Sequence, residues 1–281
     1  MSGKVFGMYA CSQGSSNSIP CSIQIDTPMT DIPLDRPTAR RFDLSRLLAV
    51  LTHPRRTFGE IAAESRPTWL TPMLVLSITA LLVVIVAGTL KTRAAMMGEV
   101  QLPPDWQWWT PEMQNNYTQA QQATQGATFM YIIPLVGSWT ALWLGWVLVA
   151  GLLHLGSTLL GGRGSMQGAL TIAAWASLPF ALRDLLRVVY MLSAGHAIGS
   201  PGLSGFATSP GFVPQLLSRL DIFVIWYILL LIIGFIIADG LSRGKAVFGV
   251  VTVMLLILLV QAGLGTLTSG VGSQAVQRPF F

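Results

Sequence analysis

Five long apolar runs, separated by polar segments, dominate the chain after residue 68. Each run supplies roughly the 20 apolar residues that a helix needs to cross a bilayer. Lipid offers no hydrogen-bond partner to unpaired backbone groups, and the continuous runs lack the alternation of barrel strands. The pattern therefore predicts an all-α, polytopic membrane helical bundle. Its five expected spans are Trp69–Leu90, a second within Thr128–Leu160, a third from Met166 past Pro179, Leu220–Ala238 and Ala246–Leu264.

The segment before the first span divides into two parts. Residues 1–40 are rich in Ser, Pro and Thr without an apolar period, which predicts a disordered cytoplasmic tail. In the juxtamembrane segment 41–68, Pro54 is placed to begin a helix, and Phe58 and Ile61 fall on one face of it. This short amphipathic helix would lie in the membrane interface or pack on the bundle as a cytosolic helix.

Composition excludes a water-soluble enzyme. Hydrophobic residues make up 52% of the 281 residues and charged residues 10%, whereas an ordinary soluble domain has about 25% charged residues. In a membrane protein the net charge of +5 bears first on topology, and we expect no nucleic-acid partner.

The distribution of basic residues orients the spans. Eleven lie in the segments that share the side of the N-terminus, four lie on the opposite side, and two belong to the third span. Because basic loops stay in the cytoplasm, we expect a multi-pass protein of the cell membrane with a cytoplasmic N-terminus. The five-span membrane domain, 69–266, would then be followed by a short extracytoplasmic tail, 267–281. The eleven are Lys4, Arg36, Arg40, Arg41, Arg46, Arg55, Arg56, Arg66, Arg163, Arg243 and Lys245; the four are Lys91, Arg93, Arg219 and Arg278.

Residues that carry catalysis or bind metals are sparse. The three histidines, His53, His154 and His196, sit in different segments, and Cys11 and Cys21 both lie in the polar tail. The stretch Gly161–Ser165 lacks the lysine of a phosphate-binding loop and reads as a tight cytoplasmic turn. We therefore expect no catalytic residue, no metal and no cofactor.

The third span has two unusual features. Small residues recur every four positions, which predicts a face that another helix approaches closely. Pro179 removes a backbone donor and should kink the helix. The small residues of this helix-packing stripe are Ser165, Ala169, Ala173, Ser177 and Ala181.

A membrane charge cluster follows the proline. Asp184 and Arg187 are three residues apart and can pair on one helix face, next to Arg183. The arginines would snorkel to the outer interface, join a buried network with Asp221 at the start of the fourth span, or form a proton or ion relay.

The first outer loop, about Lys91–Ala127, carries Trp106, Trp108 and Trp109. Tryptophans at this depth are typical of an interfacial anchor. A ligand-stacking platform is the alternative.

Several segments in order resemble the Yip-type family of Ypt/Rab-interacting membrane proteins, and especially its bacterial branch, over roughly residues 47–265. The resemblance implies a five-helix membrane domain with a cytosolic N-terminus. Eukaryotic members of the family are implicated in Rab GTPase binding and vesicle traffic, and no catalytic residues come with it. The similar segments are Leu51–Phe58, Gly161–Leu170, Ala176–Pro179, Leu220–Trp226, Gly234 and Gly240–Ala246.

Two functional hypotheses follow. The first is a non-enzymatic scaffold or adaptor that binds another membrane protein through the small-residue face of the third span or its cytoplasmic turns. The second is a small permease or transport-accessory subunit that uses the charge cluster and the Pro179 kink as a path. An enzyme acting on lipids ranks third, because no nucleophile–base pair is visible.

Overall fold

The computed structural model describes residues 45–64, 67–97, 102, 106–198, 202–206 and 211–274. The tail predicted over residues 1–40 lies outside these residues, as do residues 275–281 of the predicted C-terminal tail. Every regular element within the described residues is helical. The prediction of an all-α membrane bundle is confirmed.

Five apolar segments are long enough to cross a bilayer, in the positions that the sequence predicts. Most of the helices are longer than their apolar runs. Helix α3, for example, continues through the polar residues Lys91 and Thr92. The segments are α3 (Leu70–Met96), the π-helical turn η2 (Thr128–Ile132) with α5 (Ile133–Leu159), α6 (Met166–Ala176) with α7 (Leu178–Ala194), α9 (Ile222–Asp239) and α10 (Arg243–Gln274).

Two short helices precede the first span. Helix α1 covers Ser45–Thr52, and α2 covers Pro54–Ala63 with Pro54 in its first turn. Helix α2 packs on α9 and buries Phe58 and Ile61, which are 1% and 5% exposed. Of the two locations expected for this helix, the structure therefore favours packing on the bundle.

Helix α6 lies at the centre of the bundle. It contacts α5 and α9, and its residues from Thr171 to Ala176 are all buried. Trp175 is fully buried, and its indole N–H donates to Thr68 Oγ1 at 3.2 Å. The core therefore forms around this short helix.

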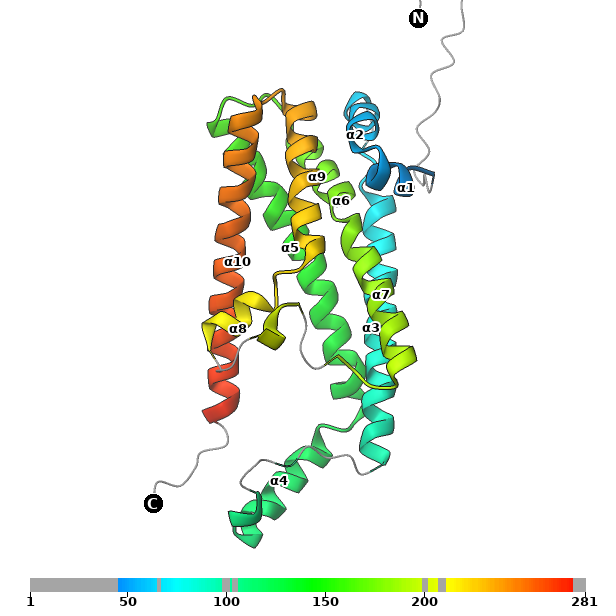
Figure 1. The fold of residues 1–281 in the computed structure, drawn as a ribbon, viewed down its shortest axis with the longest axis vertical. Helices are drawn as coiled ribbons and strands as arrows, with labels where there is room; N and C mark the ends of the chain where they lie inside the picture. The colour runs from blue at the N-terminus through cyan, green and yellow to red at the C-terminus, as the bar shows by residue number, and fades with distance from the viewer. Residues whose placement is uncertain are drawn as a thin grey trace, which may run out of the picture. The chain divides into compact units, whose positions relative to one another are not determined.

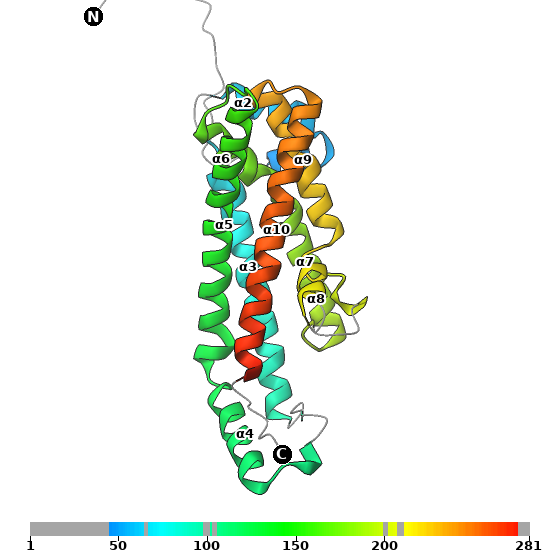
Figure 2. The same ribbon diagram turned by 90° about the vertical axis from the view of Figure 1, so that its left-hand side faces the viewer.

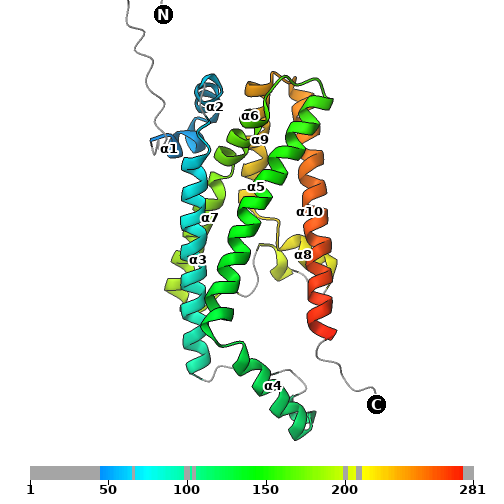
Figure 3. The same ribbon diagram turned by 180° about the vertical axis from the view of Figure 1, so that it is seen from behind.

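The bundle has two dissimilar ends (Figure 1). Helix α2 and the turn between α5 and α6 mark one, which we call the α2 end. The short helix α8 (Phe212–Leu217) packs beside α10 toward the other, the α8 end (Figure 2). Helix α4 (Pro111–Ala123) extends beyond the α8 end, and α5 and α10 diverge in that direction (Figure 3).

Candidate functional site

The small-residue stripe of the third span is part of the core. Ala169 and Ala173 are fully buried, and Ser177 and Ala181 are 9% and 5% exposed. Ser165 is exposed instead: it precedes α6, and its hydroxyl accepts a hydrogen bond from Gly168 N–H at 3.1 Å. Ser165 is therefore a helix cap and does not pack in the stripe.

The core surrounds α6 on all sides, so burial is not confined to the stripe. Leu178, which lies off the stripe, is only 3% exposed and belongs to the same hydrophobic cluster as Ala173 and Trp175. A residue off the stripe is thus buried as deeply as the residues within it. The face that the stripe offers is covered within the chain.

Pro179 interrupts the third span at the place that the sequence indicates. The span consists of two helices that meet at Ser177, and Pro179 occupies the first turn of the second. A proline fits there because the first N–H groups of a helix have no intrahelical acceptor. The interruption is thus a restart of the helix at Ser177 rather than a bend within one continuous helix.

The charge cluster lies between α7 and the start of α9. Arg183 Nε lies 3.5 Å from Asp184 Oδ1, and Arg187 Nη1 lies 3.8 Å from the same oxygen. Arg183 Nη1 also donates to Asp221 Oδ2 at 3.3 Å. The four side chains are 14–27% exposed, so the arginines share two carboxylates in a half-buried network.

Asp221 joins this network to the fourth span. Its second oxygen, Oδ1, accepts from Val224 N–H at 2.9 Å and caps α9. The Arg183 guanidinium also lies 4.7 Å from the centre of the Phe180 ring, a cation–π contact. Of the three expected roles, this geometry fits the network with Asp221.

A cavity of about 490 Å³ adjoins the cluster between α5, α7, α9 and α10. Arg183, Arg187, Arg219 and Gln261 contribute polar groups, and most of the remaining wall is apolar. Sequence analysis did not find this cavity, because it arises from the divergence of two spans far apart in the chain.

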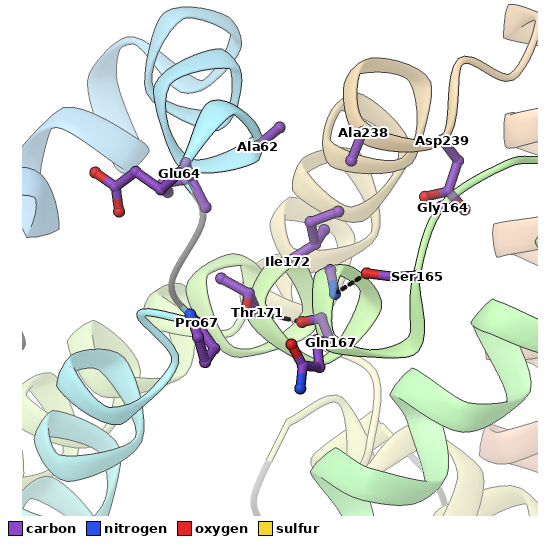
Figure 4. Close-up of a pocket in the computed structure, with 12 residues that line it drawn as sticks. Ala62, Glu64, Pro67, Gly164, Ser165, Gln167, Thr171, Ile172, Ala238 and Asp239 are labelled. Atoms are coloured by element: carbon purple, nitrogen blue, oxygen red, sulfur yellow. Dashed lines mark hydrogen bonds between the residues drawn. The ribbon is translucent and has the colours of Figure 1, made fainter. Parts of the chain in front are cut away.

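A second hollow, about 190 Å³, opens at the α2 end between α2, α6 and α9 (Figure 4). Glu64 and Asp239 lie at opposite sides of it, and the Glu64 carboxylate points away from Gln167 and Ser165. Glu64 pairs with Arg46 at 2.5 Å. The two carboxylates thus serve separate contacts.

Asp239 is a structural residue that sequence analysis missed. It is 5% exposed and accepts a hydrogen bond from the Ser157 hydroxyl, 82 residues earlier in the chain. Arg163 N–H donates to the Asp239 carbonyl at 3.3 Å. These contacts join the end of α9 to the end of α5.

The glycines between α5 and α6 are required by this junction. A Cβ on Gly164 would lie 1.8 Å from Asp239 Oδ1, and one on Gly162 would lie 2.1 Å from Ser157 Oγ. Gly161 has a φ of 89°, in the left-handed region. The Gly161–Ser165 segment is thus a tight turn packed against a hydrogen-bonded pair.

The tryptophan-rich loop folds on itself. Trp106 and Trp109 pack against each other and against Tyr117 of α4, with ring centres 5.5–5.6 Å apart. Trp108 is 81% exposed. Trp108 alone of the three is therefore free to act as an interfacial anchor or stacking surface.

Within the described part of the chain, no three His, Cys, Asp or Glu side chains gather as a metal site would require. Five apolar spans, of which the third contributes the buried central helix α6, define a polytopic, all-α integral membrane protein. The family model of the Yip1 domain matches residues 48–265, and the chain belongs to this family. No curated protein and no solved structure gives a significant match.

Proposed function

We propose that this Yip1-domain protein is a non-enzymatic membrane adaptor of the family's bacterial branch, which binds another membrane protein through the outward face of α5. The observation that carries the proposal is the low burial of this span. In its most apolar stretch 6% of the residues are buried, against 22–61% in the other four spans.

The outward face of α5 is defined by Gly137, Leu144, Leu148 and Leu155. Their spacings of seven, four and seven residues place them on one side of the helix. The three leucines are 54–57% exposed, and no atom lies within 4 Å of a Cβ built on Gly137. A partner helix could therefore approach the backbone closely at Gly137.

The small-residue stripe of the third span does not offer a comparable face. The most apolar stretch of that span is 61% buried, so its small residues serve the bundle itself. This distribution of burial supports a partner site on α5 in place of the third-span face predicted from the sequence.

The internal packing supports an adaptor over a permease. The cavity beside the charge cluster and the hollow at the α2 end are separated along α6 by Ala173–Ala176, which are fully buried. Along α9 they are separated by Leu230, Leu231 and Phe235, at 0–1% exposure. No polar path joins the two among the described residues.

Site-specific photo-crosslinking in native membranes tests this function. A photoreactive residue at Leu144 or Leu148 should give a discrete protein adduct, and Gly137→Leu should weaken that adduct by blocking close approach. Leu256 on α10, 56% exposed, is the matched control and should give lipid adducts alone. Lipid adducts alone from both helices would overturn the proposal.

A further inference from the structure

The cavity between α5 and α10 combines apolar walls with a cationic rim. Its volume of about 490 Å³ falls in the range of about 300–1,000 Å³ that is typical of small-molecule sites. The arginines cluster toward the α8 end, whereas Val149 and Met254, two of its apolar lining residues, belong to the buried core. A ligand that fits it would carry a polar group at one end and an apolar body at the other.

The rim carries a net positive charge. Arg183, Arg187 and Arg219 line the cavity. The network supplies two carboxylates: Asp184 pairs with Arg183 and Arg187, and Asp221 pairs with Arg183. No described carboxylate lies within 4 Å of the Arg219 guanidinium, and its side chain is exposed. One guanidinium at the mouth of the cavity is therefore available to an anion.

The rim also lies at the end of α9 that is opposite to Asp239. Asp221 and Asp239 bracket the 18-residue helix α9, which is about 27 Å long at 1.5 Å per residue. This length is close to the ~30 Å hydrocarbon core of a bilayer. Gln261, which lines the cavity, lies 18 residues after the start of α10 and so at a similar level. The pairing of Arg183 with Asp221 therefore places the cluster at the start of α9, about one bilayer thickness from Asp239.

The two long walls leave room for a chain between them. Near the α2 end α5 and α10 are in contact, since a Cβ on Gly156 would lie 3.7 Å from Val253. They then diverge (Figure 3), and no atom lies within 4 Å of a Cβ built on Gly145, which lines the cavity. The space between α5 and α10 is thus closed near the α2 end and open toward the α8 end. It runs along the long axis of the spans, as a lipid chain does.

We propose that this cavity binds one anionic glycerophospholipid. An acyl chain lies between α5 and α10 alongside Gly145, Val149 and Met254. The phosphate lies at the rim, where the Arg219 guanidinium pairs with it. The apolar walls exclude a free, fully hydrated anion, and the charge of the rim favours an anionic headgroup over a zwitterionic one.

Native mass spectrometry of the purified full chain tests this site with phosphatidylglycerol, phosphatidylcholine and inorganic phosphate as separate probes. Wild-type protein should retain one phosphatidylglycerol with about tenfold preference over phosphatidylcholine. Arg219→Gln should remove most of that preference, whereas Arg243→Gln, an exposed arginine at the α2 end, should preserve it. Equal retention of the two lipids by wild-type protein would overturn the proposal.

A second pair of variants tests the chain-binding part of the cavity. Gly145→Leu places a side chain in the cavity and should abolish the retained lipid. Gly137→Leu adds the same atoms to the outward face of α5, where space is also open, and should leave lipid retention unchanged. Unchanged lipid retention in Gly145→Leu would refute the site. Retention of inorganic phosphate by the wild-type protein to the same extent as phosphatidylglycerol would also refute it. Because Gly137→Leu weakens partner crosslinking and Gly145→Leu weakens lipid retention, the two proposals fail separately.

Discussion

Gly234 permits a close approach between α9 and the central helix α6. A Cβ at this position would lie 2.4 Å from Ile172 Cγ2 and 3.6 Å from Phe58 Cε1. Ordinary contacts to a Cβ are 3.4–4 Å, so Gly234→Ala requires a shift of about 1 Å. Ile172 is 2% exposed and Phe58 is 1% exposed, which leaves the neighbouring side chains little room to move.

The free energy of unfolding sets the scale of this prediction. Overpacking a dense core costs about 1–3 kcal/mol, while replacing glycine by alanine within a helix gains up to about 1 kcal/mol. Gly137→Ala lies on the open face of α5, so it should gain the helix stability of alanine without the cost of overpacking. We therefore expect Gly234→Ala to be about 1–3 kcal/mol less stable than Gly137→Ala.

Unfolding followed by tryptophan fluorescence in mild detergent measures this difference. Ile172→Leu, which removes the clashing Cγ2 at nearly constant volume, should offset part of the defect, so the double variant should be more stable than the sum of the single effects. Equal stabilities of the two alanine variants, or strictly additive effects with Ile172→Leu, would refute the proposed close packing of α9 on α6.

Two further substitutions test the junction at the α2 end and the charge cluster. Gly164→Ala should lower the melting temperature, because its Cβ would displace the Asp239 carboxylate. Gly244→Ala is the control and should leave the melting temperature unchanged, because the space around Gly244 is open. Equal melting temperatures of the two variants would show that the turn tolerates a side chain. Asp184→Asn should lower stability more than Arg183→Gln, because Asp184 is the carboxylate that pairs with Arg187, whereas Asp221 keeps its hydrogen bond to Val224 N–H when Arg183 is lost. The reverse order in the same melting assay would count against the shared ion pair.

Hydropathy predicts the spans well because each span must be apolar along its own length whatever its neighbours are. Their ends are less predictable: α3 reaches Met96, six residues beyond the predicted Leu90, since a helix need not end where its apolar run ends. Pro179 correctly marks a discontinuity, because its missing N–H is a local property of the chain. Ser165 was misassigned because helix caps and packing positions draw on the same small residues.

Contacts between distant segments were not predictable in the same way. The pairing of Ser157 with Asp239 joins residues 82 positions apart, and no periodic pattern marks either of them. The cavity depends on the divergence of α5 from α10, which neither sequence segment encodes alone. Arg183 reaching Asp221 could be anticipated, because both are charges at the same predicted end of adjacent spans.

The sidedness of the two ends is most directly tested by cysteine labelling in intact cells. With Cys11 and Cys21 replaced by serine, Glu112→Cys in α4 and Arg163→Cys in the α5–α6 turn each present one exposed thiol. A membrane-impermeant maleimide should label Glu112→Cys at once and Arg163→Cys only after permeabilisation, because basic segments remain in the cytoplasm. Labelling of both in intact cells, or of Arg163→Cys alone, would contradict the five-span arrangement with a cytoplasmic N-terminus.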